Sequence, residues 1–186
     1  PKTIAMACDV ADRVTFADGS ATERVEWAMR IAKEQIEKTG RSRGEFKIGA
    51  YVNLICDHNE KRAISMARML AGLVAHFTTM KEAPTEHLPK QLRPITEKLQ
   101  TDYDMKNHSS EKGDHLDLID DEFIDWFTIA GPPQKCIDRL GELIELGLDH
   151  IYLLGGSPVP EPRDARLRAM VEQTEIFAKE VLPNFK

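Results

Sequence analysis

The chain has 186 residues and a net charge of −6 at pH 7; 41% of its residues are apolar, 30% charged and 6% aromatic. The acidic balance argues against a nucleic acid or an anionic membrane surface as the main partner, and no stretch approaches the roughly 18 apolar residues of a membrane span. The three cysteines, Cys8, Cys56 and Cys136, form neither a CxxC pair nor a zinc-ligand spacing. We therefore expect a cytoplasmic protein with reduced, buried thiols, in which residues 1–186 belong to one domain.

The chain opens on an expected helix. Pro1-Lys2-Thr3 occupies the first turn, where proline is tolerated, and apolar residues follow at helical spacing as far as Ala11. Because a natural N-terminus rarely lies at such a point, we expect that a large upstream part of the protein is missing from this sequence.

A strand, a loop and a helix come next. Residues 14–17 form a short strand, and the polar turn Asp18-Gly19-Ser20 follows it. The helix beyond has apolar residues at i, i+3, i+4, i+7 and i+11 from Val25, and it stops at Thr39-Gly40.

The longest predicted strand spans residues 46–55. One face carries Phe46, Ile48, Ala50, Val52 and Leu54, and the other is mixed and includes Asn53. In a barrel strand this alternation sends the apolar set toward the surrounding helices and the mixed set inward, where polar side chains near the carboxyl end can meet a ligand.

The middle of the chain interrupts this pattern. A helix is expected over residues 60–79, a helical piece over 91–101, and a short acidic helix over 120–127. Three prolines punctuate residues 81–121, and this excursion is longer than an ordinary connection, so we interpret it as an insertion.

The clearest helix–strand unit lies in residues 127–157. Gly131-Pro132-Pro133 starts an amphipathic helix that ends at Gly147, and residues 150–154 read as a strand buried on both faces. A closing helix over 163–182 has an apolar face that runs from Leu167 to Val181.

Three strands, each flanked by helices, are too few to close a barrel. The simplest interpretation is an α/β fold that represents the C-terminal half of an eight-stranded βα barrel, with the insertion before the last βα unit. A complete barrel of this type has about 250 residues or more.

Three segments together resemble the luciferase-like family of flavin-dependent oxidoreductases, which includes monooxygenases and deazaflavin-dependent reductases. They are Pro1-Lys2 with Ala7 and Ala11-Asp12; Thr39-Gly40-Arg41; and Ile129 to Pro133 with Cys136 and Gly147-Leu148-Asp149. The order of these three segments matches that of the family over nearly the whole chain, and the sequence as a whole is most similar to methylenetetrahydromethanopterin-reductase-like members. Two departures are the missing glycine before Pro1 and Thr39 in place of the usual alanine.

The resemblance implies a barrel, usually a homodimer, that binds FMN or coenzyme F-420 at the carboxyl ends of the strands and acts on a small organic substrate. It places Pro1, Lys2 and Thr3 at the cofactor phosphate, where a helix start and a lysine suit an anion. It places the loop through Asp18, Gly19 and Ser20 on the substrate side of the pocket, and we add Asn53 from the inward face of its strand. The catalytic residues are expected in the missing N-terminal half.

Two rival functions stay open. One is a barrel relative that binds no flavin and serves as a subunit or ligand carrier. The other is a metal- or phosphosugar-handling barrel enzyme, in which Gly155-Gly156-Ser157 would hold a phosphate.

Several polar groups favour structural roles. We interpret Gly155-Gly156-Ser157 as a turn and His76 as a packed histidine. The carboxylates between Asp120 and Asp125 are typical of the first turn of a helix and its solvated face. No metal site is expected from His108, Asp114, His115 and Asp117, because they lie in a segment without fixed geometry.

Overall fold

The structure is a computed structural model, and it describes residues 1–78, 88–103, 106, 114–156 and 162–185. Its strands are β1 (Arg13–Phe16), β2 (Lys47–Cys56), β3 (Ile129–Gly131) and β4 (His150–Leu154). Its α-helices are α1 (Lys2–Val10), α2 (Thr22–Thr39), α3 (Glu60–Thr78), α4 (Arg93–Thr101), α5 (Asp121–Phe127), α6 (Pro133–Glu145) and α7 (Arg163–Ile176). Shorter helical turns are η1 (Lys90–Leu92), η3 (Asp114–Leu118), η4 (Phe177–Val181) and η5 (Leu182–Phe185).

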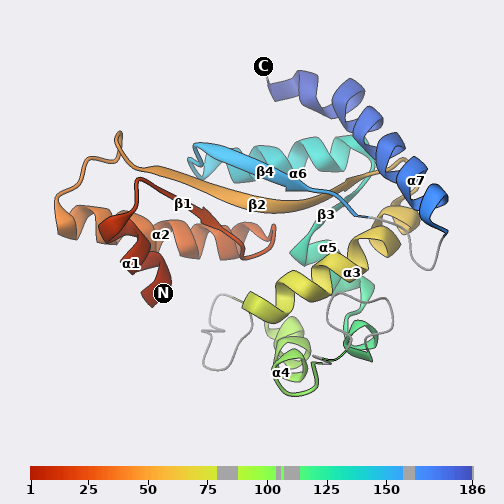
Figure 1. Ribbon diagram of the computed structural model, residues 1–186, viewed down its shortest axis with the longest axis horizontal. Coiled ribbons are helices and arrows are strands. Elements are labelled where there is room, and N and C mark those ends of the chain that lie inside the picture. Colours follow the sequence, from red (N-terminus) through yellow and green to blue (C-terminus); the bar gives the residue numbers. More distant parts are fainter. Residues whose placement is uncertain (79–87, 104–105, 107–113, 157–161, 186) are drawn as a thin grey trace.

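All strand pairings are parallel and all involve β2 (Figure 1). Gly49 and Ala50 pair with both β1 and β4, so these strands lie on opposite edges of β2. The last three residues of β2 pair with β3. The predicted α/β architecture and its three strands are therefore confirmed.

The fourth strand, β3, was not predicted. The sequence predicts Gly131-Pro132-Pro133 only as the start of a helix, whereas Ile129 and Ala130 are fully buried and pair with Leu54 and Ile55. A run of three residues carries too little periodicity to reveal a strand, and the pairing with β2 is what defines it.

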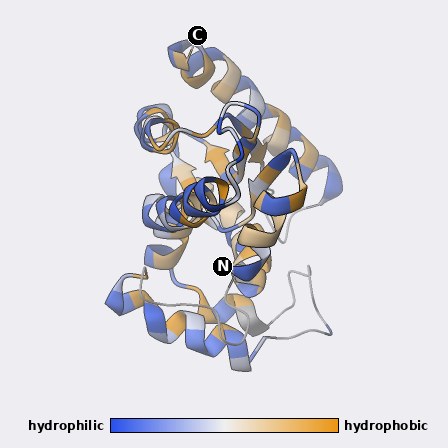
Figure 2. Cartoon of the chain, turned by 90° about the vertical axis from the view of Figure 1, so that its left-hand side faces the viewer, coloured by the Kyte–Doolittle hydropathy of each residue, from blue (hydrophilic) through white to orange (hydrophobic). Residues whose placement is uncertain are grey.

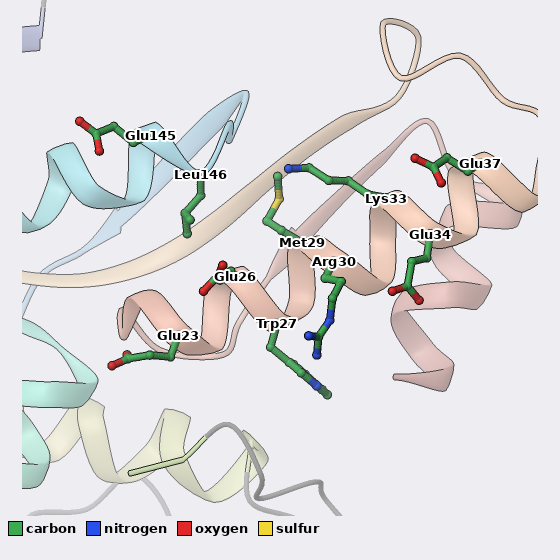
Figure 3. A pocket seen from close by; sticks show the side chains of 10 residues that line it. All are labelled: Glu23, Glu26, Trp27, Met29, Arg30, Lys33, Glu34, Glu37, Glu145 and Leu146. Atoms are coloured by element: carbon green, nitrogen blue, oxygen red, sulfur yellow. The ribbon is translucent and has the colours of Figure 1, made fainter.

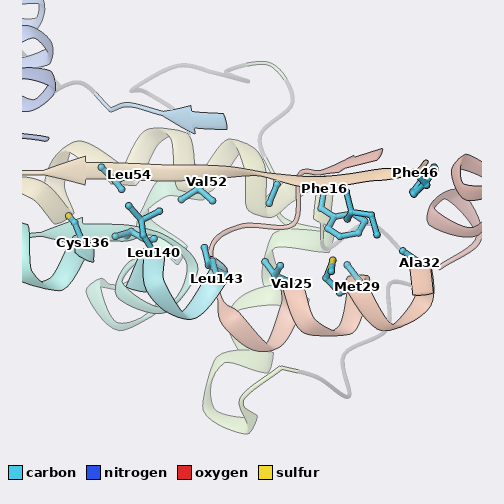
Figure 4. Packing of buried hydrophobic residues seen from close by; sticks show 14 of the residues in the cluster. Phe16, Val25, Met29, Ala32, Phe46, Val52, Leu54, Cys136, Leu140 and Leu143 are labelled. Carbon is cyan, nitrogen blue, oxygen red and sulfur yellow. The ribbon is translucent and has the colours of Figure 1, made fainter. Parts of the chain in front are cut away.

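The main core lies between β2 and two helices, α2 and α6 (Figure 4). The predicted apolar face of β2 supplies it: Phe46, Ile48, Ala50 and Val52 are fully buried and Leu54 is 6% exposed. A second cluster joins Ile55 to residues of α3, α4 and α5. Figure 2 shows largely hydrophobic strands lying between helices of mixed hydropathy, which is the layering that amphipathic helices on a sheet require.

Two segments far apart in the sequence meet at the end of α1. Arg41 donates from Nη1 to the carbonyl oxygens of Cys8 and Ala11, both at 2.6 Å, and its guanidinium lies over the Phe46 ring. The last carbonyl groups of a helix have no partner inside the helix. The arginine after Thr39-Gly40 therefore anchors α1 to the start of β2.

Two burial predictions were wrong. In β4, expected to be buried on both faces, Tyr152 is 44% and Leu153 41% exposed, because among the described strands only β2 pairs with it. The predicted apolar face of the closing helix is open in α7, since Leu167 and Val171 are exposed while Gln173 is buried, whereas Val181 at its far end is fully buried in the main core. The helical pattern located this helix, and only the end of its predicted face packs.

Candidate functional site

The loop between β1 and α2 is fixed against the end of α5. Gly19 has φ +82°, and a Cβ there would lie 2.5 Å from the ring of Phe127. The N–H of Ser20 donates to the carbonyl oxygen of Phe127 at 2.8 Å. Both the left-handed backbone and the close ring explain why glycine stands in this turn.

Two arginines hold the same loop from the side of the helices. Arg24, only 3% exposed, donates from Nε to the carbonyl oxygen of Asp18 at 2.7 Å, and its Nη2 lies 3.7 Å from the Asp18 carboxylate. Arg139 donates to the carbonyl oxygen of Ser20 at 3.2 Å. Burial raises the pKa of Asp18, and the neighbouring Arg24 opposes that shift. We interpret the Asp18–Arg24 pair as a support for the loop.

Ser20 and Asn53, both predicted pocket residues, are in contact. The N–H of Asn53 donates to Oγ of Ser20 at 3.2 Å, and both residues are buried. The Asn53 side chain is 2% exposed, yet neither its Oδ1 nor its Nδ2 has a hydrogen-bond partner among the described residues. A buried amide left in this state costs about 1–3 kcal/mol, a cost that a hydrogen bond to an ordered water or a ligand would remove.

The predicted phosphate site is an exposed helix start. Pro1, Lys2 and Thr3 are all exposed, and α1 begins at Lys2 without a side-chain cap. The described hydrogen bonds and ion pairs include none that joins this end of α1 to Ser20 or Asn53. The structure thus gathers Asp18, Gly19, Ser20 and Asn53, and the amino group of Pro1 lies close enough to act on Asp18, where burial raises the pKa of the carboxyl and the charge of Pro1 lowers it.

A polar and aromatic cluster that the sequence does not predict lies on the mixed face of the sheet. His150 Nε2 and Thr15 Oγ1 form a hydrogen bond of 3.0 Å, and Arg13 donates to the Tyr152 hydroxyl at 3.3 Å. The Tyr51 ring stacks on Tyr152 with 5.4 Å between ring centroids. These residues come from three strands, and only their register brings them together, so no local sequence signal could have found them.

The surroundings of His150 in this cluster favour its neutral form over its protonated form. Burial lowers the pKa of His150, and the positive charge of Arg13 lowers it further, while Asp149 opposes both. Gly49, in register with His150, has no side chain, and a Cβ there would lie 2.2 Å from Nε2 of the imidazole. The glycine makes room for the histidine over the backbone of β2.

Two hollows are relevant to the choice of site. A cavity of about 290 Å³ lies at the carboxyl ends of β2 and β4 against the closing helix, and its walls are Leu54, Cys56, Leu153, Gly155, Gly156, Met170, Gln173, Thr174 and Phe177. A larger hollow of about 700 Å³ lies along α2 beside the end of α6 (Figure 3), and it contains none of the predicted site residues. Five of its ten lining residues are glutamates, a composition that does not suit an anionic cofactor.

The groups expected to be structural behave accordingly. Asp120 caps α5 by accepting the Phe123 N–H at 2.8 Å, and Asp125 pairs with Lys135. The His76 ring stacks on Tyr103 with 3.6 Å between centroids.

The remaining alternatives fall partly outside the described residues. The carbonyl oxygen of buried Gly156 accepts from Gln173 Nε2 at 3.3 Å, whereas Ser157 and His108 lie outside the described residues. Among the described residues, no group of three or more His, Cys, Asp or Glu side chains could hold a metal ion, and none of the helices has the length and apolar composition of a membrane span.

Comparison with known proteins adds a sequence relationship to this geometry. The model of the luciferase-like monooxygenase family matches residues 1–150. Among curated proteins, the 5,10-methylenetetrahydromethanopterin reductase of Methanopyrus kandleri is 26% identical over 192 residues, and that of Archaeoglobus fulgidus is 24% identical over 194 residues. Both alignments cover 100% of this chain, but 48% and 52% of the relatives. The chain spans about half the length of the curated relatives it matches.

Two solved structures share the fold. The coenzyme F420 dependent tetrahydromethanopterin reductase of Methanopyrus kandleri superimposes with a TM-score of 0.65 at 24% identity, and an F420-dependent secondary alcohol dehydrogenase, in complex with an F420-acetone adduct, with 0.66 at 14% identity. Each superposition covers 100% of this chain, and 49% and 46% of those chains. The α/β fold with its parallel sheet therefore matches about half of such a structure.

Proposed function

The chain belongs to the luciferase-like monooxygenase family, and from this membership we propose that it is the C-terminal half of a barrel oxidoreductase that uses coenzyme F420 to transfer a hydride to or from a small organic substrate. The two solved structures that are named for F420 support this cofactor over FMN, which other members of the family use. We also propose that residues 81–121 are an insertion into this barrel, before its last βα unit.

The observation that carries the proposal is the unpartnered amide of Asn53. A carboxamide donates and accepts hydrogen bonds at once, so it can pair with a ring that presents a carbonyl beside an N–H, as deazaflavins and flavins do. Asn53 lies near the carboxyl end of β2, which is where βα barrels place their ligands. The chemistry of this amide suits a cofactor of this kind, and its side chain lines none of the described cavities, so binding would require the surrounding packing to open.

Each part of the site would have a defined task. Asn53 would orient the ligand through its amide, and Ser20 would hold the backbone of Asn53 in place by its hydrogen bond of 3.2 Å. Asp18 and Gly19 would shape the substrate side. When bound, the cofactor supplies the hydride chemistry itself, and the protein supplies position and exclusion of water.

The exposed start of α1 would bind the cofactor phosphate. The first N–H groups of a helix have no partner within the helix, and the helix dipole favours an anion there. Lys2 adds a positive charge and Thr3 a hydroxyl donor. A Lys2→Ala variant should weaken cofactor binding, whereas Gly155→Ala should not; the reverse result would favour the phosphosugar-type barrel.

The main experiment replaces Asn53 by leucine in the full-length protein. Removal of a buried unpartnered amide should raise the melting temperature of the ligand-free protein, while the affinity for F420, measured by absorbance titration, should fall at least tenfold, or about 1.4 kcal/mol. Gln91→Leu is the control, because Gln91 is an exposed amide in η1 that takes part in none of the described side-chain hydrogen bonds, so its loss should change neither quantity.

The titration also separates the alternatives. If the wild-type protein binds neither F420 nor FMN, the alternative is correct, in which the protein is a barrel relative that binds no flavin and serves as a subunit or ligand carrier. If it binds FMN alone, the choice of F420 is wrong. The homodimer implied by the family is a further proposal, which light scattering of the full-length protein tests.

A further inference from the structure

Two of the three cysteines lie beside the same peptide group. Cys56 is the last residue of β2 and pairs in register with Gly131 of β3. The carbonyl oxygen of Gly131 accepts the N–H of Asp57, the residue after Cys56, at 2.9 Å, and it lies 3.6 Å from Sγ of Cys136 in α6. Both cysteines are fully buried, and neither is in a disulfide.

The two thiols are close enough to affect each other's ionisation. The neighbouring Cys136 thiol lowers the pKa of Cys56, although burial and nearby carboxylates oppose the shift. The same contact, together with burial, raises the pKa of Cys136. The direction of both shifts makes Cys56 the more acidic thiol of the pair, while the Cys136 thiol donates to the carbonyl oxygen of Gly131.

Cys56 also has access to a cavity. It lines the cavity of about 290 Å³ at the carboxyl ends of β2 and β4. This space is large enough for a small neutral oxidant. Cys136 is not among the residues that line it, so the two thiols differ in access as well as in ionisation.

We propose that Cys56 and Cys136 form a peroxide-reactive dithiol, in which Cys56 is the attacking thiol and Cys136 the resolving thiol. Cys56 sulfur attacks one oxygen of hydrogen peroxide, the O–O bond breaks, and a sulfenic acid and one water are formed. Cys136 sulfur then attacks the Cys56 sulfur and expels the hydroxyl as a second water, which leaves a disulfide. Two thiols lose two electrons in total, and one peroxide is reduced to two waters.

The disulfide would join the end of β2 to the second turn of α6. Its position matters because Cys56 lies three residues beyond Asn53 on the same strand. Oxidation would thus join Cys56, which lines the cavity, covalently to α6, a helix of the main core. This inference does not depend on the proposed cofactor or substrate.

Cys8 provides a matched control within the chain. It is also fully buried, but it lies in α1, where burial raises the pKa of its thiol and the carboxylate of Asp9 adds to the shift. A thiol in that setting should react slowly with peroxide. General oxidation of buried cysteines would affect all three residues, whereas the proposed dithiol affects two.

The experiment treats the full-length wild-type protein with hydrogen peroxide, alkylates the remaining thiols after unfolding, and maps the peptides by mass spectrometry. We expect a Cys56–Cys136 cross-linked peptide at least tenfold more abundant than any product of Cys8, and its loss after treatment with dithiothreitol. The cross-link should persist in Cys8→Ser. In Cys136→Ser, dimedone should trap a sulfenic acid at Cys56.

The outcomes that overturn the proposal are equally direct. They are a Cys56 that stays reduced in folded wild-type protein, or a Cys8 that oxidises as fast as Cys56. The wild-type measurement decides the matter even if a cysteine variant fails to fold. A circular dichroism spectrum before and after peroxide checks that the cross-link forms in the folded state.

Discussion

Asp149 should stabilise the fold through its negative charge, and replacement by asparagine tests this. Its Oδ2 accepts the N–H of Ile48 at 2.8 Å and lies 2.9 Å from Arg43, while Oδ1 lies 3.3 Å from Lys47. The carboxylate thereby joins the turn before β4 to the start of β2. The Asp149→Asn variant would keep an acceptor for the backbone N–H but lose both ion pairs.

The size of the loss in stability follows from the lowered pKa of Asp149. Burial acts to raise the pKa of Asp149, but the N–H of Ile48 and the charges of Arg43 and Lys47 outweigh it and lower the pKa from 3.8 to about 2. At about 1.36 kcal/mol per pKa unit this shift corresponds to about 2.5 kcal/mol. The side chain is 22% exposed, and solvent screening reduces the contribution to about 1–2 kcal/mol.

The sign of the pH dependence is fixed by the lowered pKa. The contribution is fully present above the unfolded pKa, near pH 4, and is lost as the pH falls toward 2. In urea unfolding of the full-length protein, Asp149→Asn should therefore cost about 1–2 kcal/mol at pH 7 and progressively less between pH 4 and pH 2.

The control is Asp138→Asn, which changes an exposed carboxylate on α6. Asp138→Asn should have little effect on the free energy of unfolding at pH 7 or at pH 3. A difference between wild type and Asp149→Asn that is the same at pH 3 as at pH 7 would refute the electrostatic explanation.

Three further predictions concern packing and helix ends, and thermal unfolding of the full-length protein measures each. Gly49→Ala should cost about 1–3 kcal/mol, because its Cβ would displace the His150 ring; unchanged stability would show that the ring moves freely. Gly19→Ala should cost clearly more than Gly40→Ala: both glycines have positive φ, but a Cβ at residue 40 meets nothing within 4 Å. Arg41→Lys should lower stability by about 1–2 kcal/mol, because a single ammonium cannot reproduce the guanidinium that bonds two carbonyl groups and lies over a ring; a neutral result would contradict the role of this anchor.

The described sheet supplies the ends of β1 and β2 and the loop that Asp18, Gly19 and Ser20 form. A titration of the full-length protein is therefore the decisive functional measurement, since the chain spans about half of its curated relatives.

The sequence alone determined the elements whose signals are local. The alternation over residues 46–55 located β2 and its buried face, Gly40 ended α2 in a left-handed conformation, and the prolines at the start of α6 located that helix. It also selected Ser20 and Asn53, because a polar turn and an inward polar side chain at a strand end are readable from their neighbours in the chain.

Tertiary structure decided everything that depends on register and packing. The contact between Thr15 and His150, the room that Gly49 leaves, and the pairing of Cys56 with Gly131 all join residues far apart in the sequence. The apolar pattern of the closing helix was visible, but not which of its faces is buried. Hydrophobic periodicity reports that a segment has an apolar face, whereas the partner of that face is set by the three-dimensional arrangement of strands and helices.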